Sequence, residues 1–168
     1  QPSEGMKVFT EDARSKKSRK MVLELLVTDQ PTQEKSHDPN SHFWQMAEKV
    51  DIFKSRFDKK EKNNVPSSDL SHKAMSVNLD ACIHCNLCVR ACREVQVNDV
   101  IGMGMRGNTS KVIFDFDDPM GDSTCVSCGE CVQACPTGAL MESNLLDEKG
   151  IHKGSHDREV DSLCPYLS

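Results

Sequence analysis

Two short runs of this chain repeat the same cysteine spacing. Each run reads C-x2-C-x2-C-x3-C, with a Val and an Ala between the third and fourth Cys, and the second run follows the first after 43 residues. The members are Cys82, Cys85, Cys88 and Cys92 in the first run, and Cys125, Cys128, Cys131 and Cys135 in the second. Four thiols within eleven residues either bind metal or oxidise. The repeat therefore predicts a metal-binding module with approximate twofold symmetry.

Three kinds of chemistry use cysteines at this density. Disulfides are disfavoured because the nine cysteines of the chain are an odd number and no secretory signal indicates an oxidising compartment. Structural zinc sites combine two separated C-x2-C pairs, whereas here a third Cys follows each pair. The run is instead typical of bacterial two-cluster ferredoxins. We expect two 4Fe–4S clusters, with zinc as the weaker alternative.

In such ferredoxins the fourth Cys of each run ligates the other cluster, which assigns the ligands. The first cluster takes Cys82, Cys85, Cys88 and Cys135, and the second takes Cys125, Cys128, Cys131 and Cys92. Pro136 disfavours helical geometry at Cys135 and is expected to end the preceding helix. Arg93 replaces that proline after Cys92, so the first helix can continue through Glu94.

No other part of the chain has a catalytic pattern, and no catalytic residue is predicted. His84 lies between two ligands but is not needed, because four thiolates complete each cluster. Arg90 and Arg93 are expected at the surface. The chain has no P-loop, and Gly102-Met-Gly104 lacks the third glycine of a dinucleotide motif and is expected to be a turn. One-electron transfer is the chemistry that the residues indicate.

Two helices are expected ahead of the cysteines. The first covers residues 10–30, with Thr10 as N-cap, Glu11 and Asp12 in the first turn, and Pro31 beyond its end. Its apolar stripe is expected to be Met21, Val22, Leu25 and Leu26. The second begins after Ser41 as N-cap and has Phe43, Met46, Ala47 and Val50 on one face. Trp44 borders that face and is expected to pack there.

The predicted fold class is α+β: a bacterial-type two-cluster 4Fe–4S ferredoxin module preceded by two helices, with a polar C-terminal tail. Short strands are expected at 75–79 and at 111–116, where Val112, Phe114 and Phe116 would share a face. The expected segments are a helical segment at 1–53, a linker at 54–73, the cluster domain at 74–142 and a loose tail at 143–168.

Charge and composition limit the classes of partner that the sequence indicates. Apolar residues make up 37% of the 168 residues and the net charge is −5. Residues 1–73 carry 14 basic and 12 acidic side chains, whereas residues 74–168 carry 7 and 14. The basic cluster at 14–20 lacks interleaved aromatics, so a solvated helix is favoured over a nucleic-acid site. No run is long enough for a membrane span, and a cytoplasmic location is expected.

The sequence resembles the amino-terminal iron–sulfur region of NAD-dependent, molybdenum-containing formate dehydrogenase alpha subunits. It is more distantly similar to the large iron–sulfur subunit of NADH dehydrogenase and the diaphorase-side subunit of NAD-reducing hydrogenases. The matching segments are Asp80-Ala-Cys82, Cys88-Val-Arg-Ala-Cys92-Arg-Glu94, Phe114-Asp-Phe-Asp-Asp-Pro-Met-Gly121 and Cys131-Val-Gln-Ala-Cys-Pro-Thr-Gly-Ala-Leu140. The segment between the two cysteine runs is the more specific part.

The resemblance implies a longer parent protein. A 2Fe–2S domain would precede Gln1, and a molybdopterin domain with Mo or W would follow Ser168. Relatives also carry a cluster with one His and three Cys after the first helix; that span here has His37 and His42 without a Cys, so this cluster is not expected. Cys164 belongs to a further family motif whose next Cys is missing, and it is not expected to be a ligand.

The function implied by the resemblance is electron transfer between formate oxidation and NAD reduction. The implied partners are a flavin- and NAD-binding diaphorase subunit and the molybdopterin domain of the same complex. The active site of the parent oxidoreductase would lie outside this chain. The alternatives are a stand-alone ferredoxin-like electron carrier, or the electron-conducting segment of an NADH dehydrogenase or an NAD-reducing hydrogenase.

Overall fold

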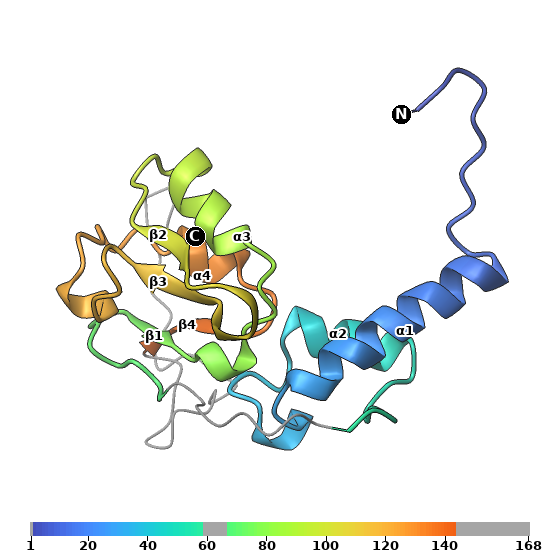
Figure 1. Cartoon of the computed structure of the whole chain (residues 1–168), viewed down its shortest axis with the longest axis horizontal. Coiled ribbons are helices and arrows are strands. Elements are labelled where there is room, and N and C mark those ends of the chain that lie inside the picture. The colour runs from blue at the N-terminus through green and yellow to red at the C-terminus, as the bar shows by residue number, and fades with distance from the viewer. Residues whose placement is uncertain (1, 59–66, 144–168) are drawn as a thin grey trace, which may run out of the picture.

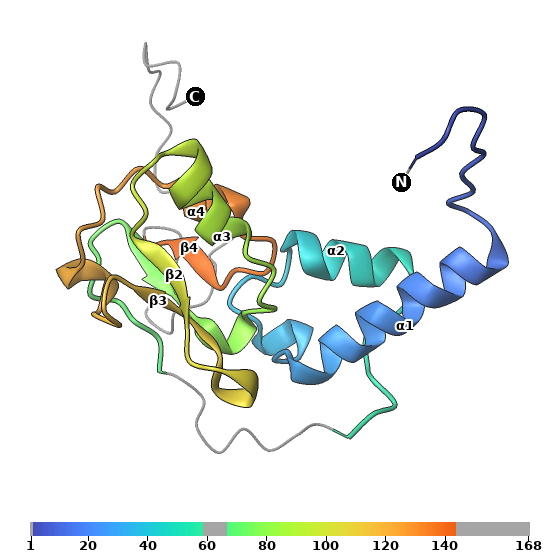
Figure 2. The same ribbon diagram turned by 45° about the horizontal axis from the view of Figure 1, so that its top comes forward.

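The computed structural model describes residues 2–58 and 67–143. Residues 2–58 form a helical lobe, and residues 67–143 form a cysteine module that contains both runs. Figures 1 and 2 show the helices α1 and α2 on one side of the module, with the amino-terminal end of α1 pointing away from it. Small sheets and short helices make up the module, as the α+β prediction requires. Within the described residues, no helix has both the length and the hydrophobicity to cross a membrane.

Helix α1 (Ala13–Asp29) begins later than predicted. Its N-cap is Asp12, whose carboxylate accepts a 2.8 Å hydrogen bond from the Ser15 amide. The prediction of Thr10 as N-cap and of acidic residues in the first turn was wrong, since the Asp12 side chain satisfies the exposed amide of the first turn itself. The end before Pro31 was predicted correctly.

The apolar stripe of α1 was also partly wrong. Val22 and Leu25 are 54% and 50% exposed, whereas Val27 is buried and Leu23 and Leu26 pack beside it. The helix therefore buries a face rotated from the one that hydrophobic spacing indicated, because α2 covers only part of its circumference (Figure 1).

Helix α2 (His42–Lys49) supplies the centre of the lobe. Ser41 is its N-cap residue, as predicted, but makes no side-chain capping bond. Trp44 is 1% exposed and packs edge-on against Phe43, with 5.2 Å between ring centroids. The small core of the lobe consists of Val27, Phe43, Trp44, Ala47 and Ile52. The packing role predicted for Trp44 is confirmed.

Two two-stranded antiparallel sheets form the frame of the module. Strand β1 (Met75–Val77) pairs with β4 (Leu140–Glu142), joining the two ends of the module. Strand β2 (Ile101–Gly104) pairs with β3 (Lys111–Phe114). The turn predicted at Gly102–Gly104 is thus a strand, and Gly104 packs closely against Ile113. Strand β3 ends before the predicted residue 116, so Phe116 does not share the buried face and is 96% exposed.

Two short helices carry the later cysteines of the runs. Helix α3 (Leu87–Arg90) continues as a π-helical turn at Ala91–Val95, which confirms that the first helix runs past Glu94. Helix α4 (Glu130–Ala134) ends at Cys135, whose backbone is extended ahead of Pro136, as predicted. The module core includes Cys88, Cys92 and Cys131 among its buried residues. The thiols therefore lie where apolar packing fixes the backbone.

Candidate metal centres

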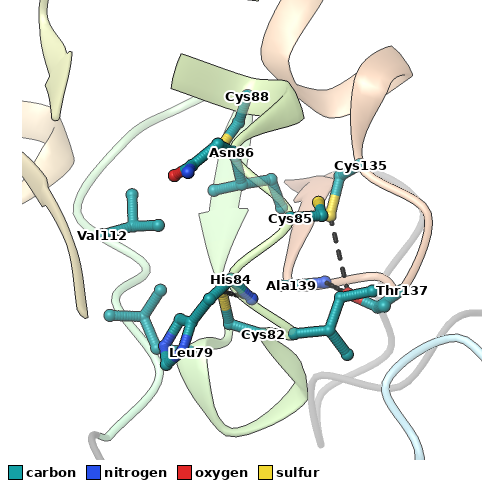
Figure 3. Close-up of a pocket in the computed structure, with 12 residues that line it drawn as sticks. Leu79, Cys82, His84, Cys85, Asn86, Cys88, Val112, Cys135, Thr137 and Ala139 are labelled. Carbon is teal, nitrogen blue, oxygen red and sulfur yellow. Dashed lines mark hydrogen bonds between the residues drawn. The ribbon is translucent and has the colours of Figure 1, made fainter. Parts of the chain in front are cut away.

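Four cysteines from both runs surround the first hollow of the module. This hollow has about 380 Å³ of space, part of it open to solvent, and is lined by Cys82, Cys85, Cys88 and Cys135. Figure 3 shows Cys85 and Cys135 on one side of it and Val112 and Leu79 on the other. Three members come from the first run, and Cys135 comes from the end of α4. These are the residues predicted for the first cluster.

The second hollow repeats this arrangement with the runs exchanged. It has about 300 Å³ of space and is lined by Cys125, Cys128, Cys131 and Cys92. Apolar residues around it include Met75, Val100 and Ile101. The four cysteines predicted for the second cluster thus lie around one hollow as well. The crossing follows from the fold, because each short helix leads from one hollow to the other.

The backbone of the two loops is nearly the same at matching positions. His84 and Ser127, 43 residues apart, have φ of 54° and 61°, and Asn86 and Gly129 have φ of 61° and 77°. These left-handed turns are uncommon outside glycine. They aim the His84 amide at the Cys82 sulfur and the Ser127 amide at the Cys125 sulfur, both over 3.4 Å. Amides directed at sulfur stabilise a negatively charged thiolate.

The thiols influence one another's protonation. Burial is the largest of the causes that raise the pKa of Cys88 to about 12, and the neighbouring Cys135, Cys82 and Cys85 also contribute to this rise. Burial likewise raises the pKa of Cys131 to about 12, with Cys125 and Cys128 as the next causes. Four thiolates in one hollow therefore repel each other unless a cation lies among them. The donor set fits a group that supplies several positive centres at once.

The donors around each hollow are all thiols. Within residues 2–58 and 67–143, no three His, Cys, Asp or Glu side chains converge closely enough to hold one metal ion. Each hollow is lined by four cysteines, and four cysteine thiolates are the ligand set of a 4Fe–4S cluster.

The segment between the runs positions the second loop, a role that cysteine spacing alone does not indicate. The Asp115 carboxylate accepts hydrogen bonds from the amide and hydroxyl of Thr124, over 2.6 and 3.0 Å, directly before Cys125. Met120 is 1% exposed, and its amide donates to Asp69 over 2.7 Å. The available sequence signal for this role was the resemblance at residues 114–121.

Two of the polar residues next to the ligands lie at the surface, as predicted. Arg90 pairs with Glu94 over 2.9 Å and Arg93 with Asp99 over 2.6 Å, all at the surface. His84 is exposed at the rim of the first hollow. Thr137 was not predicted; it is buried, with its hydroxyl 3.7 Å from the Cys135 sulfur (Figure 3). Cys164 and the tail lie outside the described residues.

Comparison with known families identifies the module. Residues 81–139 match the family described as the 4Fe–4S dicluster domain. The cysteine module of this chain is a ferredoxin-type iron–sulfur domain. The fold of the chain is similar to that of a chain in the crystal structure of an NAD⁺-reducing [NiFe]-hydrogenase in the H2-reduced state. That match has a TM-score of 0.74 at 22% identity and covers 84% of this chain and 61% of the other.

Curated relatives confirm the resemblance seen in the sequence. A Staphylococcus haemolyticus protein named as a formate dehydrogenase is 42% identical over 71 residues, and the oxidoreductase YjgC of Bacillus subtilis is 40% identical over 92. The NADP-reducing hydrogenase subunit HndD of Solidesulfovibrio fructosivorans is 33% identical over 150 residues. These matches cover 42%, 55% and 87% of this chain but 7%, 9% and 25% of the relatives. The chain therefore spans a quarter or less of the length of these relatives.

Proposed function

We propose that this chain conducts electrons through two 4Fe–4S clusters with crossed ligation. The first is held by Cys82, Cys85, Cys88 and Cys135, and the second by Cys125, Cys128, Cys131 and Cys92. The observation that carries the proposal is that each hollow is lined by three thiols of one run and the fourth thiol of the other. A bound cluster would accept and release one electron. The protein supplies the thiolates, the amides directed at sulfur and a largely apolar surround.

Iron and sulfide analysis after anaerobic reconstitution tests the proposal. Two clusters require about eight iron and eight sulfide per chain, with brown absorption near 400 nm. A stable product that holds zinc and no sulfide would refute it.

Crossed ligation has its own test in a matched pair of variants. Cys92→Ala is expected to damage the cluster on the second run, and Cys135→Ala the cluster on the first run. Electron paramagnetic resonance of the reduced variants measures which signal is lost in each. Loss of the first run's cluster in Cys92→Ala would show that each run ligates its own cluster.

The electrons are proposed to pass between formate oxidation and NAD reduction in a larger complex. In that assembly a 2Fe–2S domain and a molybdopterin domain with Mo or W would flank residues 1–168, and a flavin- and NAD-binding diaphorase subunit would be the partner. The names of two relatives support an oxidoreductase of this kind. We propose the segments 1–53, 54–73, 74–142 and 143–168 as its units, a cytoplasmic location, and no cluster ligation by Cys164.

A second candidate, the electron-conducting segment of an NAD(P)-reducing hydrogenase, is favoured by the extent of the matches. The match to the hydrogenase subunit covers 87% of this chain, against 42% for the formate dehydrogenase. Purifying the native complex and comparing formate-dependent with H2-dependent NAD(P) reduction separates the two. Molybdenum or tungsten in the complex would favour the formate dehydrogenase assignment, whereas nickel or a hydrogen-activating iron site would favour the hydrogenase assignment. A chain purified alone that shuttles electrons between soluble enzymes would indicate a stand-alone carrier.

A further inference from the structure

The two cysteine loops have matching sequences but unequal surroundings. Ile83 follows the first Cys of the first run, and Val126 holds the same position in the second run, 43 residues later. Ile83 packs against the core of the helical lobe, which is centred on Trp44. Val126 is 62% exposed. The lobe therefore packs against the first loop at Ile83, whereas the matching position of the second loop faces solvent.

The lobe also reaches the fourth ligand of the first site. The amide of Phe43, in the first turn of α2, donates a 2.9 Å hydrogen bond to the carbonyl of Pro136. Pro136 directly follows Cys135. Its counterpart in the other run is Arg93, whose side chain is 57% exposed and pairs with Asp99 of the module itself. At the second site, the residue after the fourth ligand therefore forms a surface ion pair within the module.

Two further contacts join the lobe to the segments around the first site. Gly138 lies so close to Asp38 that a Cβ at position 138 would approach the Asp38 Cβ to 2.8 Å. The His37 imidazole pairs with the Asp80 carboxylate over 3.0 Å, and both side chains are mostly buried. The contacts at Asp80 and Ile83 lie on both sides of Cys82 in the sequence, and those at Pro136 and Gly138 follow Cys135.

We propose that the helical lobe clamps and shields the first cluster site, so that the two clusters differ in their kinetic stability. A cluster can be lost only when its ligand loops open, and loops held by packed contacts open less often than exposed ones. The lobe fixes the backbone next to Cys82 and Cys135, while the Val126 loop is held by hydrogen bonds within the module, from Thr124 to Asp115 and between Ser127 and His72. The inference rests on the proposed two-cluster function and adds that the first cluster is the protected one.

Chelation of the reconstituted full-length chain tests the difference. Under anaerobic conditions, an iron chelator should bleach the absorption near 400 nm in two phases of similar amplitude, with rates that differ by about tenfold or more. In the Cys92→Ala variant the remaining first cluster should bleach at the slow rate. A single phase in the wild type, with both clusters loaded at the start, would overturn the shielding.

Ile83→Ala and Val126→Ala are a matched pair at the same loop position. Ile83→Ala removes the contact with the lobe and should accelerate the slow phase by about fivefold or more. Val126→Ala removes no packed contact and should leave the slow phase unchanged. Equal acceleration by both variants, or none by Ile83→Ala, would refute the role of the lobe. If no cluster binds in the wild type, the proposed function fails instead.

Hydrogen exchange of the unmutated protein provides a second measurement that does not depend on a variant folding. Coupling between two sites is reciprocal, so loss of the first cluster should loosen the lobe contact as well. The Phe43 amide should lose protection by about tenfold when the clusters are removed. The Ile52 amide, which bonds to Ala47 within the lobe over 3.0 Å, is the control and should change little. Unchanged protection at Phe43 would contradict the clamp.

Discussion

Gly121→Ala is the sharpest test of how the segment between the cysteine runs holds the second loop. A Cβ at position 121 would lie 2.5 Å from the carbonyl carbon of Ser71 and 3.0 Å from the amide nitrogen of His72. Both neighbours are backbone atoms, so no side chain can rotate away. The Gly121 amide also donates to the Ser71 hydroxyl over 2.8 Å. The methyl group must therefore separate two chain segments that are hydrogen-bonded to each other.

The size of the effect follows from these contacts. Inserting a methyl group into a packed site destabilises by about 1–3 kcal/mol, and the loss of one hydrogen bond adds roughly 1 kcal/mol. The sum is about 2–4 kcal/mol. For a domain of the module's size, each kcal/mol lowers the unfolding temperature by about 4–8 °C, so a decrease of at least about 8 °C is expected.

The assay is thermal bleaching of the reconstituted protein, followed anaerobically near 400 nm at a fixed heating rate. Because unfolding with cluster loss is not a reversible two-state process, only temperatures measured at the same rate are compared. Gly102→Ala is the matched control. Its Cβ would meet only an Ile113 side-chain atom at 3.9 Å, an ordinary van der Waals distance.

The two glycine substitutions are expected to have different effects on the bleaching temperature. Gly102→Ala should change the bleaching temperature by no more than about 3 °C, because it creates no clash and reduces the freedom of the unfolded chain. If Gly121→Ala behaves like Gly102→Ala, the close approach of residue 121 to residues 71 and 72 does not exist in the folded protein. The anchoring of the second loop by this segment would then be wrong.

Three further predictions concern single groups of the module and the tail. Thr137→Val should lower the reduction potential of the first cluster by about 40 mV and leave that of the second cluster unchanged, as measured by redox titration. The reason is that the variant loses a hydrogen bond to Cys135 worth about 1 kcal/mol, which disfavours the reduced state. Burial raises the pKa of Asp69, but hydrogen bonds from Ser71 and the Met120 amide outweigh burial, so the net pKa is lowered. Asp69→Asn should therefore lower the thermal stability between about pH 5 and pH 8. The difference from wild type should become smaller only below about pH 4, where the Asp69 carboxylate of the wild type becomes protonated. Cys164→Ser should leave iron content unchanged and reduce oxidative dimer formation on non-reducing gels; loss of a cluster would contradict this.

The cysteine chemistry could be predicted from sequence because it depends on local spacing. Three thiols at C-x2-C-x2-C spacing on one tight turn face a common point whatever surrounds them. Pro136 ends α4 for an equally local reason. The ferredoxin-type domain and the α+β class follow from such signals.

Features that depend on tertiary contacts were missed. Phe116 continues the alternation of β3 in the sequence, but Asp115 turns the backbone at φ 48° and uses its carboxylate to hold Thr124. The strand therefore ends at Phe114, two residues before the pattern does. The glycines at 102 and 104 have the composition of a turn, yet pairing with β3 makes them a strand. In both cases a partner distant in sequence overrides the local preference.

The different surroundings of the two loops could not be predicted from the repeated cysteine motif. Ile83 and Val126 are both β-branched, occupy the same position of the same motif, and have no local difference that would assign one to a core. They differ because the lobe core, which includes residues of α2, packs against Ile83. The α2 residues precede the first run by about forty positions and contact it only through tertiary packing. A pseudo-symmetric sequence thus gives chemically equivalent ligand sets whose loops pack against different surroundings. In an electron-transfer domain this matters, because burial and solvent exposure are among the factors that set cluster potential, and the two clusters need not be equivalent even though their ligands are.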